Sequence, residues 1–94
     1  MKKGAILINT SRGPLVDEAA LVAAVAAGSI IAALDVYDKE PLPEGHPLRA
    51  SKGAVLTPHL GYGVAETWAN FYPRSIENAM AFLDGRPIRV VAAA

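Results

Sequence analysis

Residues 4–35 read GAILINTSRGPLVDEAALVAAVAAGSIIAALD, a pattern that predicts a strand, a helix and a second strand. Ala5–Asn9 is apolar up to its closing asparagine, which is typical of a strand buried on both faces in a parallel sheet. Asp17 stands where a helix N-cap is expected, and Glu18–Ala27 consists almost entirely of strong helix formers. Ile30–Leu34 is a second apolar run. The three segments form a β-α-β unit, which predicts two parallel strands joined by a crossover helix.

The remaining chain predicts a third strand and a long helix. Val36–Lys52 is rich in proline and is expected to form a loop with no regular element. Ala54–Thr57 is the third short apolar run, and Val64–Leu83 has the periodicity of a helix that Pro73 should kink or split. Ile88–Val91 is expected to be a terminal strand or only a tail. The helix has an apolar stripe, which is more typical of helix packing than of base stacking: Trp68, Phe71, Tyr72, Ile76, Met80 and Leu83. The fold class is therefore α/β, a three-stranded parallel sheet with a crossover helix plus a long C-terminal helix.

The composition argues against several kinds of partner. The 94 residues contain nine Lys and Arg and nine Asp and Glu, so no basic surplus is available for a nucleic-acid backbone. The absence of cysteine excludes disulfides and thiolate metal sites. His46 has no partner at metal-ligand spacing, so it is expected at the surface and no metal site is predicted. Apolar runs are far shorter than the ~20 residues that span a bilayer. A soluble, cytoplasmic protein without nucleic-acid or membrane partners is expected.

Polar residues follow each of the three predicted strands. Arg12, Asp35 and His59 stand at the strand ends, and the carboxyl ends of parallel strands meet at one edge of a sheet. Glu40 lies in the proline-rich loop, close to the same edge. An imidazole beside a carboxylate is a tunable general acid/base, and an arginine offers a planar fork for a substrate carboxylate. This set suits chemistry on a small anionic molecule with a hydroxyl or carbonyl group.

The same residues also have ordinary structural uses. Arg12 could be a solvated loop residue, and Asp35 could be a turn or cap residue at a strand end. His59 follows a proline and could hydrogen-bond the backbone rather than take part in catalysis. Residue types and spacing alone leave both interpretations open.

Three segments resemble the motifs of a known family. Ile6–Asp17 resembles the arginine-bearing signature of the NAD(P)-dependent D-isomer-specific 2-hydroxyacid dehydrogenases. Ala33–Pro43 is similar to the segment with their catalytic glutamate, and Leu56–Gly61 is similar to the segment with their catalytic histidine. The three motifs occur in family order and spacing, and the resemblance runs from Met1 to about Val91. It implies a partial Rossmann-like sheet and an oxidoreductase.

The resemblance also implies a role for each catalytic residue. His59 matches the acid/base that exchanges a proton with the C2 oxygen of the substrate. Glu40 matches the partner that hydrogen-bonds this histidine and stabilises its protonated form. Arg12 matches the residue that holds the substrate carboxylate. The expected substrate is a small D-2-hydroxy or 2-keto acid.

A cofactor site follows from the same resemblance. The expected cofactor is NAD or NADP, with Asp35 as the acceptor for the nicotinamide carboxamide. The residues expected to contact it are Thr10, Ser11, Arg12, Asp35, His59 and Gly61.

The chain departs from the family in having no G-x-G-x-x-G dinucleotide fingerprint. It is therefore expected to be a C-terminal fragment that shows no turnover alone. Residues 1–63 would be half of a nucleotide-binding domain with the catalytic motifs, and residues 64–94 a helix and tail returning to the substrate domain. The alternative is a non-catalytic relic or a small self-associating α/β module. In either case a strand edge without its neighbour predicts a homo-oligomer.

Overall fold

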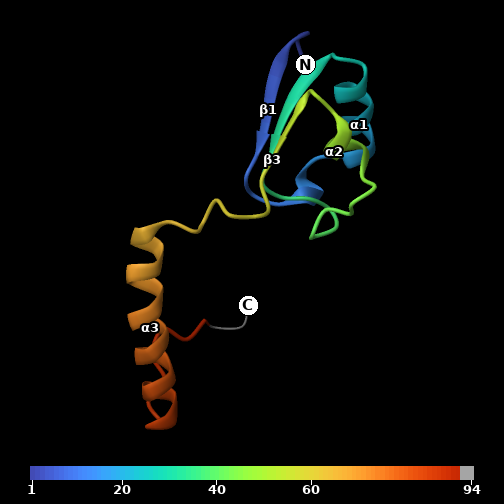
Figure 1. Ribbon diagram of the computed structural model, residues 1–94. Coiled ribbons are helices and arrows are strands. Elements are labelled where there is room, and N and C mark those ends of the chain that lie inside the picture. Colours follow the sequence, from blue (N-terminus) through green and yellow to red (C-terminus); the bar gives the residue numbers. More distant parts are fainter. Residues whose placement is uncertain (92–94) are drawn as a thin grey trace. The chain divides into compact units, whose positions relative to one another are not determined.

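The computed structural model describes residues 1–91 and contains two compact units, Met1–Gly61 and Tyr62–Ala94 (Figure 1). Each unit is described by itself below. The elements of the first unit are β1 (Ala5–Asn9), a 3-10 turn (Gly13–Leu15), α1 (Glu18–Ala26), β2 (Ile30–Leu34), α2 (Pro47–Ala50) and β3 (Ala54–Leu56). The second unit contains one helix, α3 (Ala65–Leu83). No helix within residues 1–91 combines the length and the apolar character needed to cross a membrane.

The sheet of the first unit has the predicted parallel arrangement. Its strand order is β1-β2-β3, and both neighbouring pairs are parallel, with Leu7 opposite Ala32 and Ala33 opposite Val55. The third strand ends at Leu56, one residue before the predicted end, although the Thr57 N–H still donates to the Leu34 carbonyl at 2.9 Å. The predicted α/β class and strand positions are therefore confirmed.

Helix α1 covers one face of this sheet. It begins after Asp17, whose Oδ1 accepts a hydrogen bond from the Ala20 N–H at 3.0 Å, the usual N-cap contact. Leu21 and Val25 are buried and belong to the same apolar core as Ile30 in β2. Because the connection between β1 and β2 is this helix, the two strands can pair in parallel.

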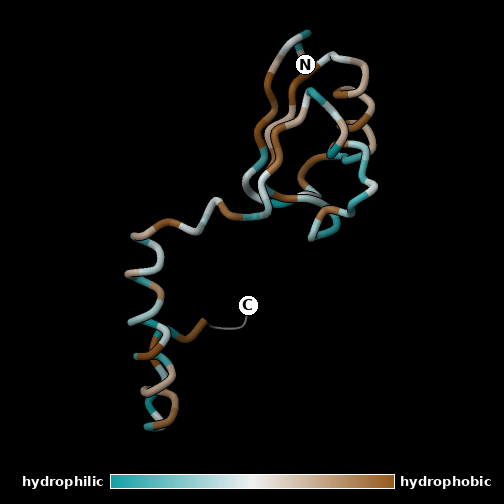
Figure 2. Tube along the Cα trace, in the orientation of Figure 1, coloured by the Kyte–Doolittle hydropathy of each residue, from teal (hydrophilic) through white to brown (hydrophobic). Residues whose placement is uncertain are grey.

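The other face of the sheet carries exposed apolar side chains. Burial alternates along the strands, so that Ile6 and Ile8 of β1, Ile31 of β2 and Val55 of β3 are exposed. The expectation that β1 is buried on both faces is therefore wrong for the described residues. Apolar colouring runs along the strands in Figure 2, and the core that packs against them lies on the α1 side only.

The loop between β2 and β3 corrects two predictions. It was expected to lack regular structure, but it contains α2, which has Pro47 at its first position and buried Leu48 on its inner side. Proline is well tolerated at the start of a helix because its missing N–H has no helical partner there. His46 was expected at the surface, but its side chain is only 13% exposed and caps α2 by accepting from the Leu48 N–H. Both predictions failed because contacts with α1 fold this loop back onto the unit.

In the second unit, α3 runs for 19 residues through Pro73, which does not split it. None of its residues is buried, and its apolar stripe is exposed. The Trp68 and Tyr72 rings stack at a centroid distance of 5.5 Å. Ile88–Val91 forms no strand, and Arg89 joins this tail to α3 through Glu77 at 2.7 Å.

Candidate active site

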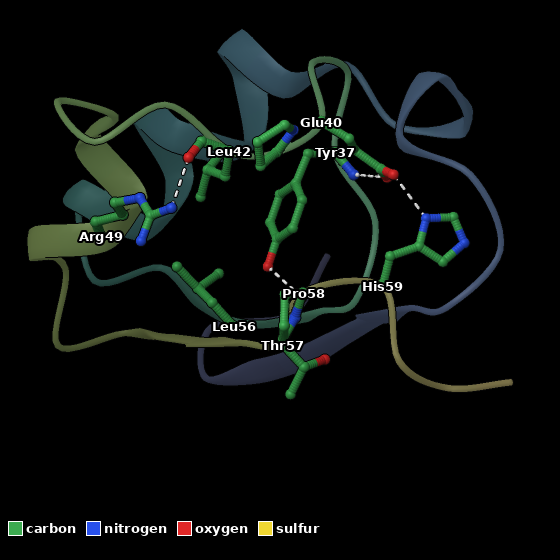
Figure 3. A pocket seen from close by; sticks show the side chains of 9 residues that line it. Tyr37, Glu40, Leu42, Arg49, Leu56, Thr57, Pro58 and His59 are labelled. Carbon is green, nitrogen blue, oxygen red and sulfur yellow. Dashed lines mark hydrogen bonds and ion pairs between the residues drawn. The ribbon is translucent and has the colours of Figure 1, made fainter. Parts of the chain in front are cut away.

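A hydrogen-bonded carboxylate and imidazole lie at the carboxyl edge of the sheet. Oε2 of Glu40 is 2.6 Å from Nδ1 of His59, and Oε1 of Glu40 accepts from the Tyr37 N–H at 3.0 Å (Figure 3). The contact expected between these two side chains is therefore present. The glutamate comes from the loop after β2 and the histidine from the segment after β3, so the fold brings together residues 19 positions apart.

The surroundings of Glu40 keep it charged. The hydrogen bond from His59 lowers the pKa of the Glu40 carboxyl below its ordinary value, and the Tyr37 N–H and the charge of Arg12 add to the effect. Because Nδ1 of His59 is occupied by Glu40, Nε2 is the nitrogen left for proton exchange. Figure 3 shows this second nitrogen pointing away from Glu40 and from the Tyr37 ring.

Asp35 holds the turn that presents His59. Its carboxylate accepts from the Leu60 and Gly61 N–H groups, each at 2.8 Å, and from the Thr57 hydroxyl, so it binds the chain on both sides of the histidine. The Thr57 hydroxyl, followed by the two N–H groups, lowers the pKa of Asp35. The turn places His59 at φ 56°, a left-handed conformation that is uncommon for residues other than glycine.

Gly61 contributes space to this turn. A Cβ added at Gly61 would lie 3.0 Å from Oδ2 of Asp35, which is tighter than ordinary van der Waals contact. A larger residue would therefore push against the carboxylate that binds the Gly61 N–H.

Arg12 is presented by a turn that Asn9 organises. Asn9 is buried; its Nδ2 donates to the Arg12 carbonyl at 2.8 Å, and its Oδ1 accepts from the Ser11 N–H at 3.1 Å. The guanidinium of Arg12 is exposed and donates through one nitrogen to the Ser11 carbonyl at 2.6 Å. Arg12 follows the carboxyl end of β1 and so belongs to the same sheet edge as the pair, and its charge adds to the lowering of the pKa of Glu40.

Sequence reasoning missed two residues that fix this edge. Tyr37 is buried, and its hydroxyl lies 2.8 Å from the Thr57 carbonyl and 3.1 Å from the Leu34 carbonyl, so it joins the ends of β2 and β3. Burial, and then the charge of Asp35, raises the pKa of Tyr37. A Cβ at Gly13 would lie 2.1 Å from the carbonyl carbon of Tyr37, so the chain after β2 can pass only over a glycine. The Gly13-Pro14 step after β1 was the signal in the sequence that could have indicated such a close approach.

A pocket of about 240 Å³ borders the Glu40–His59 contact (Figure 3). Tyr37, Leu42 and Leu56 provide much of its apolar wall. Arg49 also lines it, but its guanidinium donates to the carbonyls of Pro43 at 2.9 Å and Leu42 at 2.5 Å, and so braces the loop.

An open parallel sheet with polar groups gathered at its carboxyl edge defines a nucleotide-binding α/β domain. A family model described as "D-isomer specific 2-hydroxyacid dehydrogenase, NAD binding domain" matches residues 1–61. The chain therefore belongs to the D-isomer specific 2-hydroxyacid dehydrogenase family, as the three motifs predicted.

Individual relatives agree with this assignment. The chain is 48% identical over 87 residues to a glyoxylate reductase of Aeropyrum pernix, covering 92% of this chain and 26% of the relative. It is 48% identical over 86 residues to glyoxylate/hydroxypyruvate reductase B of Serratia proteamaculans, covering 90% of this chain and 26% of that relative. The chain thus spans about a quarter of the length of these curated relatives.

Solved structures share the fold. The TT0316 protein from Thermus thermophilus is 50% identical with a TM-score of 0.84, covering 95% of this chain and 29% of that one. The D-lactate dehydrogenase of Lactobacillus jensenii, solved with NAD+, is 31% identical with a TM-score of 0.80. The match covers 100% of this chain and 32% of that one.

The residues at the sheet edge fit the nicotinamide end of a dinucleotide. Thr10, Ser11, Arg12 and Gly61 are exposed residues at this edge, so a ligand can reach them, although the Ser11 and Gly61 N–H groups already bond to Asn9 and Asp35. Asp35 is buried and its carboxylate accepts three hydrogen bonds, which leaves about one of its four acceptor positions unused. The fit does not extend to the pyrophosphate, since the sequence has no G-x-G-x-x-G turn. Residues 1–91 contain no cluster of three or more His, Asp or Glu side chains placed to bind a metal.

Proposed function

We propose that this chain provides the proton-transfer part of an active site that moves a hydride between NAD(P) and a small D-2-hydroxy or 2-keto acid. The observation that carries this proposal is the 2.6 Å contact between Glu40 Oε2 and His59 Nδ1 at the carboxyl edge of an NAD-binding domain. A carboxylate on one imidazole nitrogen orients the ring and leaves the other nitrogen to act on substrate.

His59 is the proton donor when a 2-keto acid is reduced. When bound, the nicotinamide supplies or accepts the hydride at the substrate C2 carbon. Nε2 of His59 gives a proton to the C2 oxygen, so the carbonyl becomes a hydroxyl and the imidazole becomes neutral. In the oxidative direction Nε2 takes that proton back. Glu40 keeps the ring oriented throughout, because both of its oxygens are held, one by His59 and the other by the Tyr37 N–H.

Arg12 is the anion-binding group of this proposal. Its guanidinium is exposed at the same edge and is anchored by one nitrogen on the Ser11 carbonyl. The planar fork suits a carboxylate, which all 2-hydroxy and 2-keto acids possess. Since the similar relatives are named glyoxylate and hydroxypyruvate reductases, glyoxylate and hydroxypyruvate are the substrates to test first.

Asp35, Thr10, Ser11 and Gly61 would hold the cofactor beside His59. The exposure of Thr10, Ser11 and Gly61 at the carboxyl edge of an NAD-binding domain supports this assignment. NAD and NADP are both kept as candidate cofactors, because the sequence lacks the G-x-G-x-x-G turn and the residue after it that distinguishes the two.

A chimera tests the function. The segment of the Aeropyrum pernix glyoxylate reductase that aligns with this chain is replaced by residues of this chain, and reduction of glyoxylate by NADH and NADPH is followed. We expect turnover, and we expect His59→Ala to lower kcat by about 10²–10⁴-fold through loss of acid/base catalysis. Lys52→Ala, an exposed residue away from the pair, is the control. A chimera that binds the cofactor but does not reduce glyoxylate or hydroxypyruvate, or a His59→Ala variant with undiminished kcat, overturns the proposal.

A second candidate function is self-association without catalysis. The observation that favours it is the exposed apolar face of the sheet, which includes Ile6, Ile8 and Val55, together with β1 at the edge of the strand order. Exposed strand edges and contiguous apolar surface favour pairing with another chain. A homo-oligomer is compatible with both candidate functions.

A further inference from the structure

The loop that carries Glu40 is closed by a residue of another element. Glu40 lies between Asp38 and His46, and both of these contact the carboxylate of Glu18, the first residue of α1. Oε2 of Glu18 accepts from the Asp38 N–H at 3.3 Å, and Oε1 is 3.1 Å from Nε2 of His46. One carboxylate therefore joins the two ends of the segment that presents Glu40.

The contact of Glu18 with His46 involves one tautomer of the imidazole. Nδ1 of His46 accepts from the Leu48 N–H at 3.3 Å, so the ring hydrogen is on Nε2 and is donated to Glu18. The side chains are 13% exposed for His46 and 26% exposed for Glu18, which leaves little room for water to compete. The same ring thus caps α2 and fixes one end of the loop.

Glu18 belongs to a helix that is packed on the core. Helix α1 is held in the core by Leu21 and Val25, and its N-terminus is capped by Asp17 without the help of Glu18. The Glu18 carboxylate is consequently available to hydrogen-bond the loop. Its contact at Asp38 is one residue from Tyr37, whose N–H binds Glu40 directly.

We propose that Glu18 is a positioning residue for the Glu40–His59 pair, acting by fastening Asp38 and His46 so that the intervening loop holds Glu40 against His59. The pair's catalytic role rests on the function proposed above, whereas the fastening is a property of this chain itself. The competing explanation is that Glu18 merely stabilises α1, since an acidic residue in the first turn interacts favourably with the helix dipole.

The test compares three variants of the 94-residue chain by NMR. Glu18→Gln keeps the shape of the side chain but cannot accept at both ends, because its NH2 group would face one of the donors. His46→Asn keeps an N-cap for α2 and is too short to reach Glu18, so it tests the proposal even if the first variant does not fold. Asp17→Ala weakens the start of α1 and leaves the Glu18 contacts in place, which makes it the matched control.

Two measurements separate the explanations. In Glu18→Gln and His46→Asn, we expect the pKa of the Glu40 carboxyl, followed by carboxyl carbon shifts, to rise towards its ordinary value as the bonds from His59 and Tyr37 loosen. We also expect the Tyr37 amide to exchange about tenfold faster, the effect of losing a hydrogen bond to a charged group that is partly exposed. Asp17→Ala should change neither.

Two results would overturn the proposal: an unchanged Glu40 pKa in both loop variants, or the same rise in Asp17→Ala, which would assign the effect to helix stability. Both measurements are made without cofactor or substrate. If the chimera fails to turn over, the positioning role of Glu18 is unaffected. If the positioning role fails, the proposed function is likewise unaffected.

Discussion

Helices α1 and α3 show that length does not decide what a helix contributes to stability. Helix α1 has nine residues, buries Leu21 and Val25, and supports the loop that presents Glu40. Helix α3 has 19 residues, a clear apolar stripe and no buried residue. Most helical stability in proteins comes from packing an apolar face rather than from intrinsic propensity. The first unit therefore has a core of its own, whereas α3 presents an apolar surface with nothing packed on it among the described residues.

The largest expected difference between the two units is in side-chain truncation. Leu48 is 1% exposed and Leu83 is 82% exposed. Leu48→Ala should lower the free energy of unfolding of the first unit by about 2–5 kcal/mol, because it removes buried methyl groups and leaves a cavity. Leu83→Ala should change the free energy of unfolding by less than about 0.5 kcal/mol, because its side chain is exposed. Urea unfolding followed through Tyr37 and Trp68 resonances would measure both, and equal effects of the two variants would contradict the comparison.

The next difference concerns which exposed apolar surface drives association. We expect an oligomer by light scattering at high protein concentration, since both the β1 face and the α3 stripe are exposed. Ile8→Glu places a charge on the β1 face, and Met80→Glu places one on α3. If association through the β1 face dominates, the first variant lowers the mass further than the second, and the reverse order would assign association to α3. A 9.8 kDa monomer for the unsubstituted chain would rule out both surfaces.

A smaller effect is expected from acid. The pKa values of Asp35 and Glu40 are lowered in the folded protein, mainly by the hydrogen bonds from Thr57 and His59 respectively. A group with a lowered folded pKa stabilises the fold above its unfolded pKa, about 4, and this stabilisation is lost as the pH falls further. The urea midpoint of the first unit should therefore be lower at pH 3.5 than at pH 7. A midpoint that stayed constant or rose would contradict these shifts.

The sequence predicted the strands well because each is a short apolar run with a polar end. Local patterns of neighbouring residues were enough to predict the parallel sheet, helix α1 and its Asp17 cap. The Glu40–His59 contact came from the family motifs, because no local pattern relates residues 19 positions apart.

Contacts between distant segments could not be predicted in the same way. His46 was interpreted as a surface residue because its partner, Glu18, is 28 positions earlier in the chain. Asp35 was expected to face the cofactor, yet most of its acceptor capacity is used by the chain around His59, which only the folded backbone reveals. The exposed stripe of α3 shows the opposite difficulty, since its periodicity predicts an apolar face but not what covers it.

The clamp of Asp35 on the turn around His59 also has a consequence for the order of folding. Asp35 and Gly61 are 26 positions apart, and the connection between β2 and β3 must close before they meet. Closing such long loops costs entropy before any contact repays it, so parallel pairing of this kind is slow. The imidazole therefore reaches its native orientation only once β3 has paired with β2, and its resonance would report the formation of this strand pair.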